Sequence, residues 1–133
     1  MPRFVHQAAA IPVRDGLVCL VTSRSGRRWV IPKGRIEIHQ STSDAAAAEA
    51  WEEAGVLGTL SNESVGGYSY VKEGRDHRVT VFLLTVETVR DDWPEQYQRR
   101  REWVTPDTAY ARLEEPELRE IVRTACAAVE SAG

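Results

Sequence analysis

Three glutamates whose spacing could support catalysis or metal binding lie in the segment Glu49-Ala50-Trp51-Glu52-Glu53-Ala54-Gly55. On an α-helix, with about 3.6 residues per turn, the side chains of Glu49, Glu52 and Glu53 would lie within an arc of about 100°. Carboxylates so close together repel one another, which raises the pKa of at least one of them unless a cation lies between them. Mg²⁺ or Mn²⁺ would relieve this repulsion, because hard cations prefer carboxylate oxygens. On these residues alone, a solvated acidic helix face remains the alternative.

Basic residues form two groups elsewhere in the chain. The first group lies within residues 24–35 and the second is Arg99-Arg100-Arg101. A site that pairs carboxylates with nearby cations suits a metal–phosphate substrate, although solvated loop charge is the simpler interpretation of any single residue. The formal net charge of −3 argues against a nucleic-acid binder with a broad basic face. We therefore expect a small-molecule partner and consider nucleic acid and membrane unlikely partners.

Length and composition favour one ordinary globular domain over residues 1–133, with 42% hydrophobic and 28% charged residues. No apolar run approaches the ~20 residues that span a bilayer. Residues 1–6 lack the apolar stretch of a secretory signal, so a cytoplasmic location is the default expectation. Cys19 and Cys126 each lie in an apolar segment, which is typical of reduced core thiols.

The elements that must position the acidic segment can be placed by apolar pattern and turn signals. Ser41 can cap a helix with Asp44 in capping-box position, and Gly55 lies where a glycine should end it. The pattern predicts a mixed α/β (α+β) fold with a largely mixed sheet. The expected strands are 5–13 and 17–22 (paired as a hairpin), 29–31, 59–71, 78–89 and 102–104; the expected helices are 41–54, 105–113 and 116–130, and 33–40 is expected to be a loop.

The stretch from Gly34 to Val56 resembles the Nudix box of the MutT-like Nudix hydrolases, written G-x5-E-x7-R-E-U-x-E-E-x-G-U. The positions that match it are Gly34, Glu49, Ala50 (the apolar position), Glu52, Glu53, Gly55 and Val56. Gln40 stands where the box has its first glutamate, and Ala48 where it has arginine. In the family that arginine helps to orient the acidic cluster. One lost ion pair could account for both departures. The resemblance implies a Nudix fold, a mixed sheet sandwiched between helices.

Shorter segments extend the resemblance over most of the chain, in the order and spacing of the diphosphoinositol polyphosphate phosphohydrolase branch, which also includes dinucleoside polyphosphate hydrolases. These segments are Trp29-Val30-Ile31-Pro32-Lys33-Gly34, His77-Arg78-Val79, Asp92-Trp93 and Arg100-Arg101-Glu102-Trp103. The resemblance implies hydrolysis of a diphosphate linkage by water attack at phosphorus, with Mg²⁺ or Mn²⁺ as cofactor.

The same resemblance implies roles for individual residues. Glu49, Glu53 and the backbone carbonyl of Lys33 would bind metal, and Glu52 would be the general base, although Glu52 and Glu53 exchange that role within the family. The implied substrate contacts are Ser23, Arg24, Arg75, His77 and Arg99. A strand-edge histidine bonded to backbone is the alternative for His77, and a mobile loop arginine is the alternative for Arg99.

The substrate stays open between related phosphate anhydrides. Val5-His6-Gln7 and Glu115-Pro116 stand where the inositol branch carries basic residues, so a nucleoside or dinucleoside polyphosphate is more plausible than a densely charged inositol phosphate. A nucleotide-sanitising pyrophosphatase and an RNA 5′-end pyrophosphohydrolase are rivals. The departures at Gln40 and Ala48 keep a catalytically weak nucleotide-binding or regulatory module in view. A monomer and a homodimer are equally compatible with the sequence.

Overall fold

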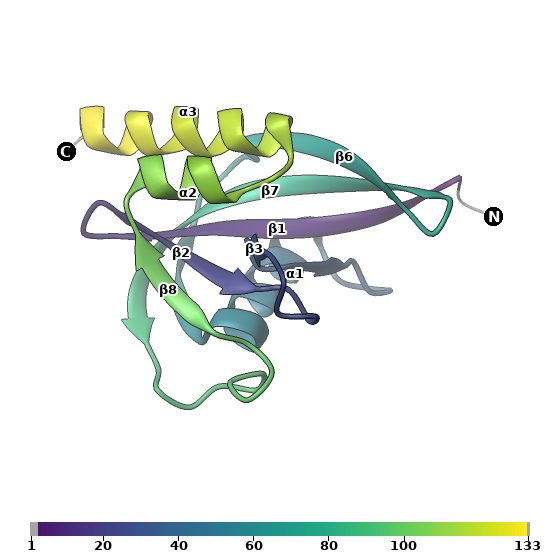
Figure 1. Cartoon of the computed structure of the whole chain (residues 1–133), viewed down its shortest axis with the longest axis horizontal. Coiled ribbons are helices and arrows are strands. Elements are labelled where there is room, and N and C mark those ends of the chain that lie inside the picture. Colours follow the sequence, from purple (N-terminus) through teal and green to yellow (C-terminus); the bar gives the residue numbers. More distant parts are fainter. Residues whose placement is uncertain (1–2, 133) are drawn as a thin grey trace.

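Two long parallel strands form the centre of the sheet. In the computed structural model, which describes residues 3–132, β1 (Phe4–Arg14) and β7 (Arg75–Val89) pair from Phe4↔Asp76 to Val13↔Thr85 (Figure 1). β2 (Leu17–Thr22) folds back on β1 as the predicted antiparallel hairpin. β2 is also paired with β3 (Trp29–Val30) and β8 (Arg101–Val104), which extend the sheet on that side.

The prediction of one strand over residues 59–71 is wrong. The structure has two strands there, β5 (Val56–Leu60) and β6 (Gly66–Lys72), which pair antiparallel with successive parts of β7. They are separated by a polar turn in which the Ser61 hydroxyl donates to the Glu63 carbonyl at 2.8 Å and accepts from the Leu83 N–H at 3.1 Å. The predicted loop 33–40 is also wrong in part, because β4 (Lys33–Arg35) pairs antiparallel with β1.

Both faces of the central strands are buried, which explains why β1, β2 and β7 read as apolar runs. Side chains of successive residues point to opposite faces of a strand, so alternate residues enter two separate cores. On β1, Ile11 and Val13 belong to one core while Ala8 and Ala10 belong to the other. The sheet is therefore the middle layer of three.

Helices cover the two faces separately (Figure 1). α2 (Pro106–Arg112) and α3 (Pro116–Ala132) pack on one face with Leu113, Leu118 and Val122, and the alanine-rich α1 (Thr42–Glu49) packs on the other. This arrangement confirms the predicted mixed α+β fold class with its sheet between helices.

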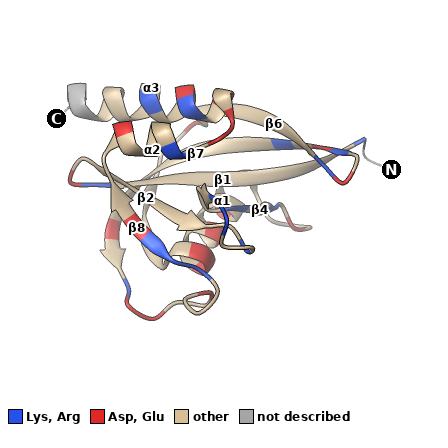
Figure 2. Ribbon diagram, in the orientation of Figure 1, with Lys and Arg blue, Asp and Glu red and all other residues tan. Residues whose placement is uncertain are grey.

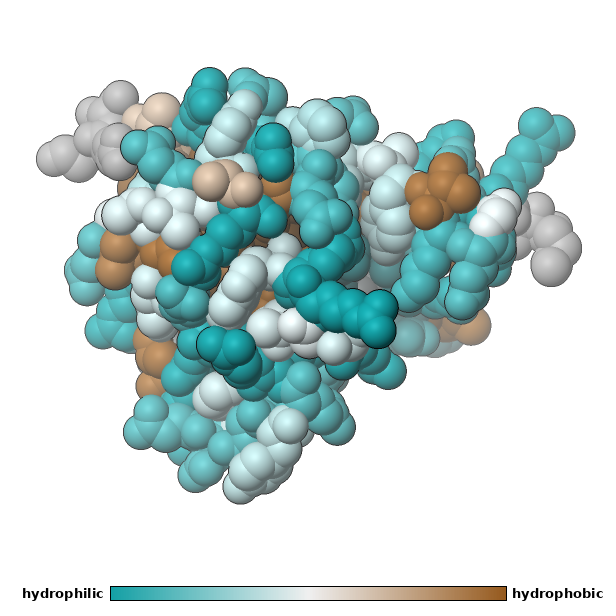
Figure 3. Space-filling view, viewed as in Figure 1, coloured by the Kyte–Doolittle hydropathy of each residue, from teal (hydrophilic) through white to brown (hydrophobic). Residues whose placement is uncertain are grey.

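The described surface is mostly polar, and Figure 3 shows hydrophilic side chains over most of one face. Val129, predicted to lie on the apolar side of the last helix, is 39% exposed and lines a small pocket together with Val13 and Thr85 of the sheet. Within residues 3–132, no helix is both long and apolar enough to cross a membrane.

The acidic helix departs from the predicted single α-helix. The Ser41 hydroxyl accepts from the Asp44 N–H at 3.0 Å, which confirms the N-cap, and Gly55 ends the helix with a left-handed φ of 67°. Between these ends, α1 stops at Glu49 and continues as a π-helix, η1 (Ala50–Ala54). The acids of this stretch differ in exposure, since Glu53 is buried while Glu52 is exposed, although the charges of both still act on Glu49. Such π-turns occur frequently at functional sites.

Candidate functional site

The largest cavity of the described residues, of about 870 Å³, opens beside the acidic helix. Two of its walls carry carboxylates, Glu49 and Glu53 from the helix and Glu115 from the α2–α3 connection. Cations line much of the rest: Arg24, Arg27, Arg28, Lys33, Arg35, Lys72 and Arg99. Figure 2 shows the acidic ribbon of the helix beside the basic segment that leads into β8. The fold thus brings the acidic segment, the first predicted basic group and Arg99 of the second to one cavity.

The side chain of Glu53 is only 7% exposed, and each of its carboxylate oxygens has a partner. The Lys33 N–H donates to Oε1 at 3.3 Å, and the Arg99 guanidinium pairs with Oε2 at 3.4 Å. The backbone carbonyl of Glu53 accepts from the Trp93 indole at 3.1 Å. Because β4 is tied to β1, the sheet fixes the position of Lys33 and hence one side of the carboxylate.

Gly34 allows the Glu49 carboxylate to lie directly against β4. A Cβ atom at position 34 would lie 1.7 Å from Glu49 Oε1, which is far inside van der Waals contact. The first glycine of the box therefore leaves the space that the Glu49 carboxylate occupies.

The two carboxyl groups that the acidic helix places in the cavity have raised pKa values. Burial raises the pKa of Glu49 to about 8, and the charges of Glu53 and Glu52 add to the shift. Burial likewise raises the pKa of Glu53 to about 7, against the opposing effects of Arg99 and the Lys33 N–H. Burial also lowers the pKa of the Lys33 ammonium. A bound cation would lower both pKa values again, because it stabilises the ionised carboxylates.

A pH dependence of stability follows from these raised values. A carboxyl whose pKa is higher in the folded than in the unfolded state stabilises the fold below its ordinary pKa of 4.5, and this contribution is lost as pH rises to about 7 for Glu53 and about 8 for Glu49. With metal chelated, we expect the unfolding temperature to fall between pH 5 and 8, and to fall less in a Glu49→Gln, Glu53→Gln double variant. Stabilisation by added Mg²⁺ should grow over the same interval. Parallel curves for the two proteins in chelator would contradict this.

The other candidate residues are distributed around this centre. Arg24 is exposed and lines the cavity, whereas the Ser23 hydroxyl accepts from the Arg28 N–H at 3.2 Å within the turn after β2. Arg75 lies at the exposed start of β7, outside the cavity lining. The His77 ring stacks on Tyr70, a lining residue, at 4.8 Å between centroids, and its Nδ1 lies 3.0 Å from the Arg75 carbonyl oxygen. His77 therefore makes the backbone contact that was the alternative to a substrate contact.

The loop between β7 and β8 and the first residue of β8 contribute residues that the sequence prediction missed. Arg101 donates to the carbonyls of Ala54 at 2.8 Å and Arg90 at 2.9 Å, and its guanidinium lies over the Trp93 ring. Glu95 pairs with Arg99 at 2.9 Å. The i,i+4 spacing of Glu95 and Arg99 was a usable signal for this pair, but nothing local indicated that the loop folds onto the acidic helix.

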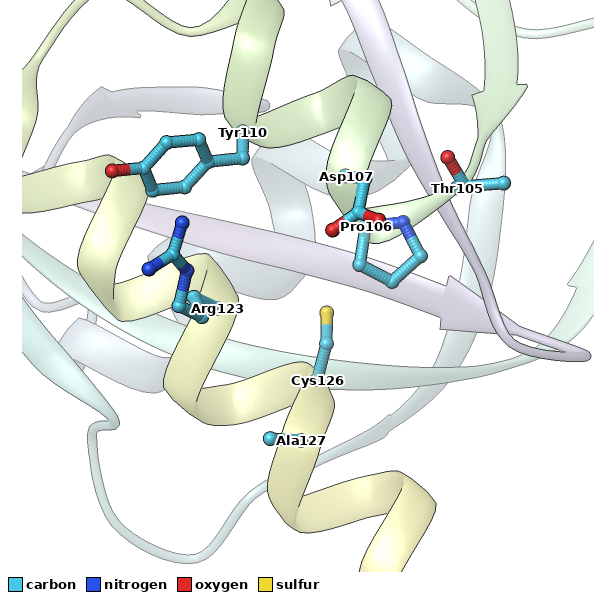
Figure 4. Close-up of a pocket in the computed structure, with 7 residues that line it drawn as sticks. All are labelled: Thr105, Pro106, Asp107, Tyr110, Arg123, Cys126 and Ala127. Carbon is cyan, nitrogen blue, oxygen red and sulfur yellow. The ribbon is translucent and has the colours of Figure 1, made fainter.

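A second cavity of about 260 Å³ lies between α2 and α3 (Figure 4). It shares no lining residue with the large cavity, and the guanidinium of Arg123 at its edge lies over the Tyr110 ring, 4.0 Å from the centroid. It has one carboxylate in its lining, that of Asp107. The paired acids and clustered cations are found only in the larger of the two, which we take as the candidate site.

Comparison with known proteins agrees with this arrangement. The NUDIX domain profile matches residues 5–125. The chain belongs to the NUDIX family. The predicted superfamily is thereby confirmed, and the NUDIX match includes every candidate site residue.

Curated relatives of this NUDIX chain come from the expected branch. It is 35% identical over 106 residues to diphosphoinositol polyphosphate phosphohydrolase 3-alpha of Mus musculus, covering 75% of this chain and 63% of the relative. It is 33% identical to diphosphoinositol polyphosphate phosphohydrolase 3-beta of Homo sapiens, covering 80% of this chain and 67% of the relative. This chain thus spans about two thirds of the length of these relatives.

Solved structures share the fold of this NUDIX chain. An Ap4A hydrolase binary complex from C. elegans superimposes with a TM-score of 0.81 at 19% identity, covering 96% of this chain and 98% of that one. The E. coli ORF135 protein has a TM-score of 0.73 at 21% identity, covering 94% and 90%. At such identities the likeness establishes the fold alone.

Proposed function

We propose that this protein hydrolyses a diphosphate linkage in a substrate of the form X–P–P–Y, with Mg²⁺ or Mn²⁺ as cofactor, through a single domain over residues 1–133. Residues 1, 2 and 133 of that range lie outside the described structure. The observation that carries the proposal is the pair of half-buried Glu49 and buried Glu53 at the edge of a cavity otherwise rich in cations. The curated relatives, named as phosphohydrolases, support it.

The donors present suit a hard divalent cation. Carboxylate and carbonyl oxygens are the ligands that such cations prefer. Within residues 3–132, no three side chains of His, Cys, Asp or Glu are grouped so as to hold a metal by themselves. The ligands proposed on resemblance are the carboxylates of Glu49 and Glu53 and the backbone carbonyl of Lys33, and bound water and substrate oxygens would complete the set.

The chain's own residues would position the substrate and move the proton. A bound divalent cation neutralises phosphate oxygens and lowers the pKa of water. Arg24, from the loop after β2, would hold a phosphate at the cavity wall, with Ser23 shaping that loop. Glu52 is proposed as the group that accepts a proton from the attacking water; its exposure to solvent would let it release that proton again. Arg75 and His77 remain proposed phosphate contacts on resemblance, whereas the guanidinium of Arg99, predicted with them, is paired with Glu53.

Glu115 favours a substrate with an uncharged portion. It pairs with Arg28 at 3.3 Å, and its side chain is only 17% exposed. Glu114 pairs with the same guanidinium at 3.4 Å. Two carboxylates therefore neutralise the charge of Arg28, so this end of the cavity has no cation available for a further phosphate. Its carboxylate oxygens can instead accept hydrogen bonds from hydroxyl or amino groups of a substrate. This arrangement fits a nucleoside or dinucleoside polyphosphate better than an inositol ring that carries phosphate at every position.

A hydrolysis screen tests the proposed function. Purified protein would be incubated with dinucleoside polyphosphates, nucleoside triphosphates, nucleoside diphosphate sugars and diphosphoinositol phosphates, each with Mg²⁺, Mn²⁺ or chelator. We expect metal-dependent release of phosphate-terminated products from at least one nucleotide class. Folded protein that turns over none of these substrates would favour the rival proposal, a nucleotide-binding or regulatory module.

Reversing the charge at position 115 should shift the substrate preference. In Glu115→Lys, Arg28 loses one partner and the cavity gains a cation, so we expect the ratio of kcat/KM for diphosphoinositol phosphate over dinucleoside polyphosphate to rise roughly tenfold or more, as a change of one close charge contact produces. Glu117→Lys, on the exposed start of α3, is the matched control. Equal ratios in the two variants would show that Glu115 does not select the substrate.

One observation favours the binding module. Glu53, a proposed metal ligand, is already paired with the buried Arg99, so a cation must share this carboxylate with a guanidinium. Tight binding of an unhydrolysed nucleotide in the screen, unaffected by chelator, would support that module.

A further inference from the structure

The Arg99 side chain points inward and is enclosed by protein acceptors. It is only 6% exposed, and each of its three guanidinium nitrogens has a partner. Nη2 faces Glu53 Oε2 at 3.4 Å, Nε donates to Glu95 Oε1 at 2.9 Å, and Nη1 donates to the Thr22 carbonyl at 2.9 Å. The alternative of a mobile loop arginine is therefore wrong. A phosphate could bind Arg99 strongly only by displacing or sharing these partners.

The acidic helix itself supplies no cation to Glu53. Neither the last turn of α1 nor that of η1 carries a basic residue, and the box position expected to be arginine is Ala48. A buried carboxylate without a partner is costly to maintain. The guanidinium that meets Glu53 comes instead from the loop between β7 and β8.

That loop is anchored on the acidic segment at several points. The Glu95 N–H donates to the Glu52 carbonyl at 3.0 Å, the Trp93 indole donates to the Glu53 carbonyl at 3.1 Å, and Arg101 donates to the Ala54 carbonyl at 2.8 Å. A Cβ atom on Gly55 would lie 2.8 Å from the Trp93 ring, so the glycine lets the loop pack closely. Arg99 thus belongs to a loop whose position is fixed by its contacts with η1.

We propose that Arg99 is the positioning residue for Glu53 and supplies, from the β7–β8 loop, the guanidinium that the helix lacks at Ala48. Its place in catalysis rests on the proposed function. Arg99 fixes Oε2 while the Lys33 N–H fixes Oε1, so the carboxylate plane is set by two donors from different elements. Ala48 is then a tolerated departure, because the orienting charge has moved to another part of the chain.

Kinetics separate this role from that of a phosphate contact. In Arg99→Ala we expect kcat to fall roughly 10–100-fold, the usual effect of removing a group that orients a metal ligand, with KM for the diphosphate substrate little changed. Arg99→Lys should recover part of the loss, and Arg100→Ala, the adjacent exposed arginine, is the control. A raised KM with unchanged kcat in Arg99→Ala would overturn the proposal and leave Arg99 as a substrate contact.

Restoring the box arginine at position 48 tests whether Arg99 takes over the role of that arginine. Ala48→Arg introduced into Arg99→Ala should recover at least about tenfold of the lost kcat, whereas Ala48→Arg alone should add little, because Glu53 already has its partner. The double variant must first be shown to fold by its thermal unfolding. If the folded double variant has the same kcat as Arg99→Ala, an arginine at position 48 cannot replace Arg99, and this part of the proposal is wrong.

A third measurement needs no turnover. In chelator, Arg99→Ala should lower the unfolding temperature by on the order of 10 °C, since breaking a buried ion pair leaves a buried charge without a partner. In a Glu53→Gln background the same change should cost clearly less. Equal losses in both backgrounds would overturn the proposed pairing. If the pair is coupled but no substrate is hydrolysed, the proposed function fails while the positioning contact stands.

Discussion

Replacing Glu53 by Gln is expected to lower metal-dependent turnover by roughly 10²–10³-fold, while the protein stays folded. The amide keeps the size of the carboxyl and an oxygen for the Lys33 N–H, and Arg99 keeps its pairings with Glu95 and Thr22. What disappears is the negative charge of a proposed metal ligand, and losing one group that stabilises charge in a transition state commonly costs ~10²–10³ in kcat. Turnover would be measured at saturating substrate over a range of Mg²⁺ concentrations.

The control for this change is Glu63→Gln, which neutralises an exposed loop glutamate and should leave turnover unchanged. Thermal unfolding of both variants in chelator shows that the fold persists. If Glu53→Gln retains wild-type turnover at every Mg²⁺ concentration, the assignment of Glu53 to the metal is wrong.

Adding one methyl group at Gly34 is expected to be the next most damaging change. The new Cβ would lie 1.7 Å from Glu49 Oε1, so the carboxylate must swing away from β4. The end of a flexible side chain can move at little cost to the fold, so we expect a small change in unfolding temperature. Displacement of a ligand by about 1 Å is enough to cost roughly 10²-fold in rate. The expected result is therefore a large loss of turnover in a stable protein.

A double-mutant cycle with Glu49→Ala tests the reason for that loss. If Gly34→Ala acts by displacing Glu49, it should cost little further turnover once the carboxylate is gone. Additive losses in the double variant would mean that the methyl group acts elsewhere, for example on the β4–β1 pairing.

The sequence located the acidic segment well because its signals are local. The Ser41 hydroxyl caps the start of the helix, and the left-handed backbone of Gly55 ends it. Both residues lie where the pattern predicted the helix ends. The π-turn was not predictable in this way. Its end at Gly55 packs against Trp93, 38 positions away in the chain, a contact that no periodicity records.

The environment of the acidic pair was less predictable, because long-range packing creates it. The sequence indicated mutual repulsion between carboxylates, whereas the structure shows burial as the larger cause of the raised pKa values of Glu49 and Glu53. Arg99 was expected to face substrate, yet its guanidinium is turned to Glu53. Glu115 was noted only as a missing positive charge, and its pairing with Arg28 became visible once the α2–α3 connection was placed beside β3.

The most direct test of the central claim is a crystal structure with Mn²⁺ and a dinucleoside polyphosphate whose bridging oxygen is replaced by methylene. We expect anomalous density for manganese between the carboxylates of Glu49 and Glu53 and the Lys33 carbonyl, at the ~2.0–2.3 Å typical of a hard cation and its oxygen ligands. The diphosphate should lie against that density in the large cavity. Manganese and diphosphate bound elsewhere, in a protein that hydrolyses the natural substrate, would contradict the account.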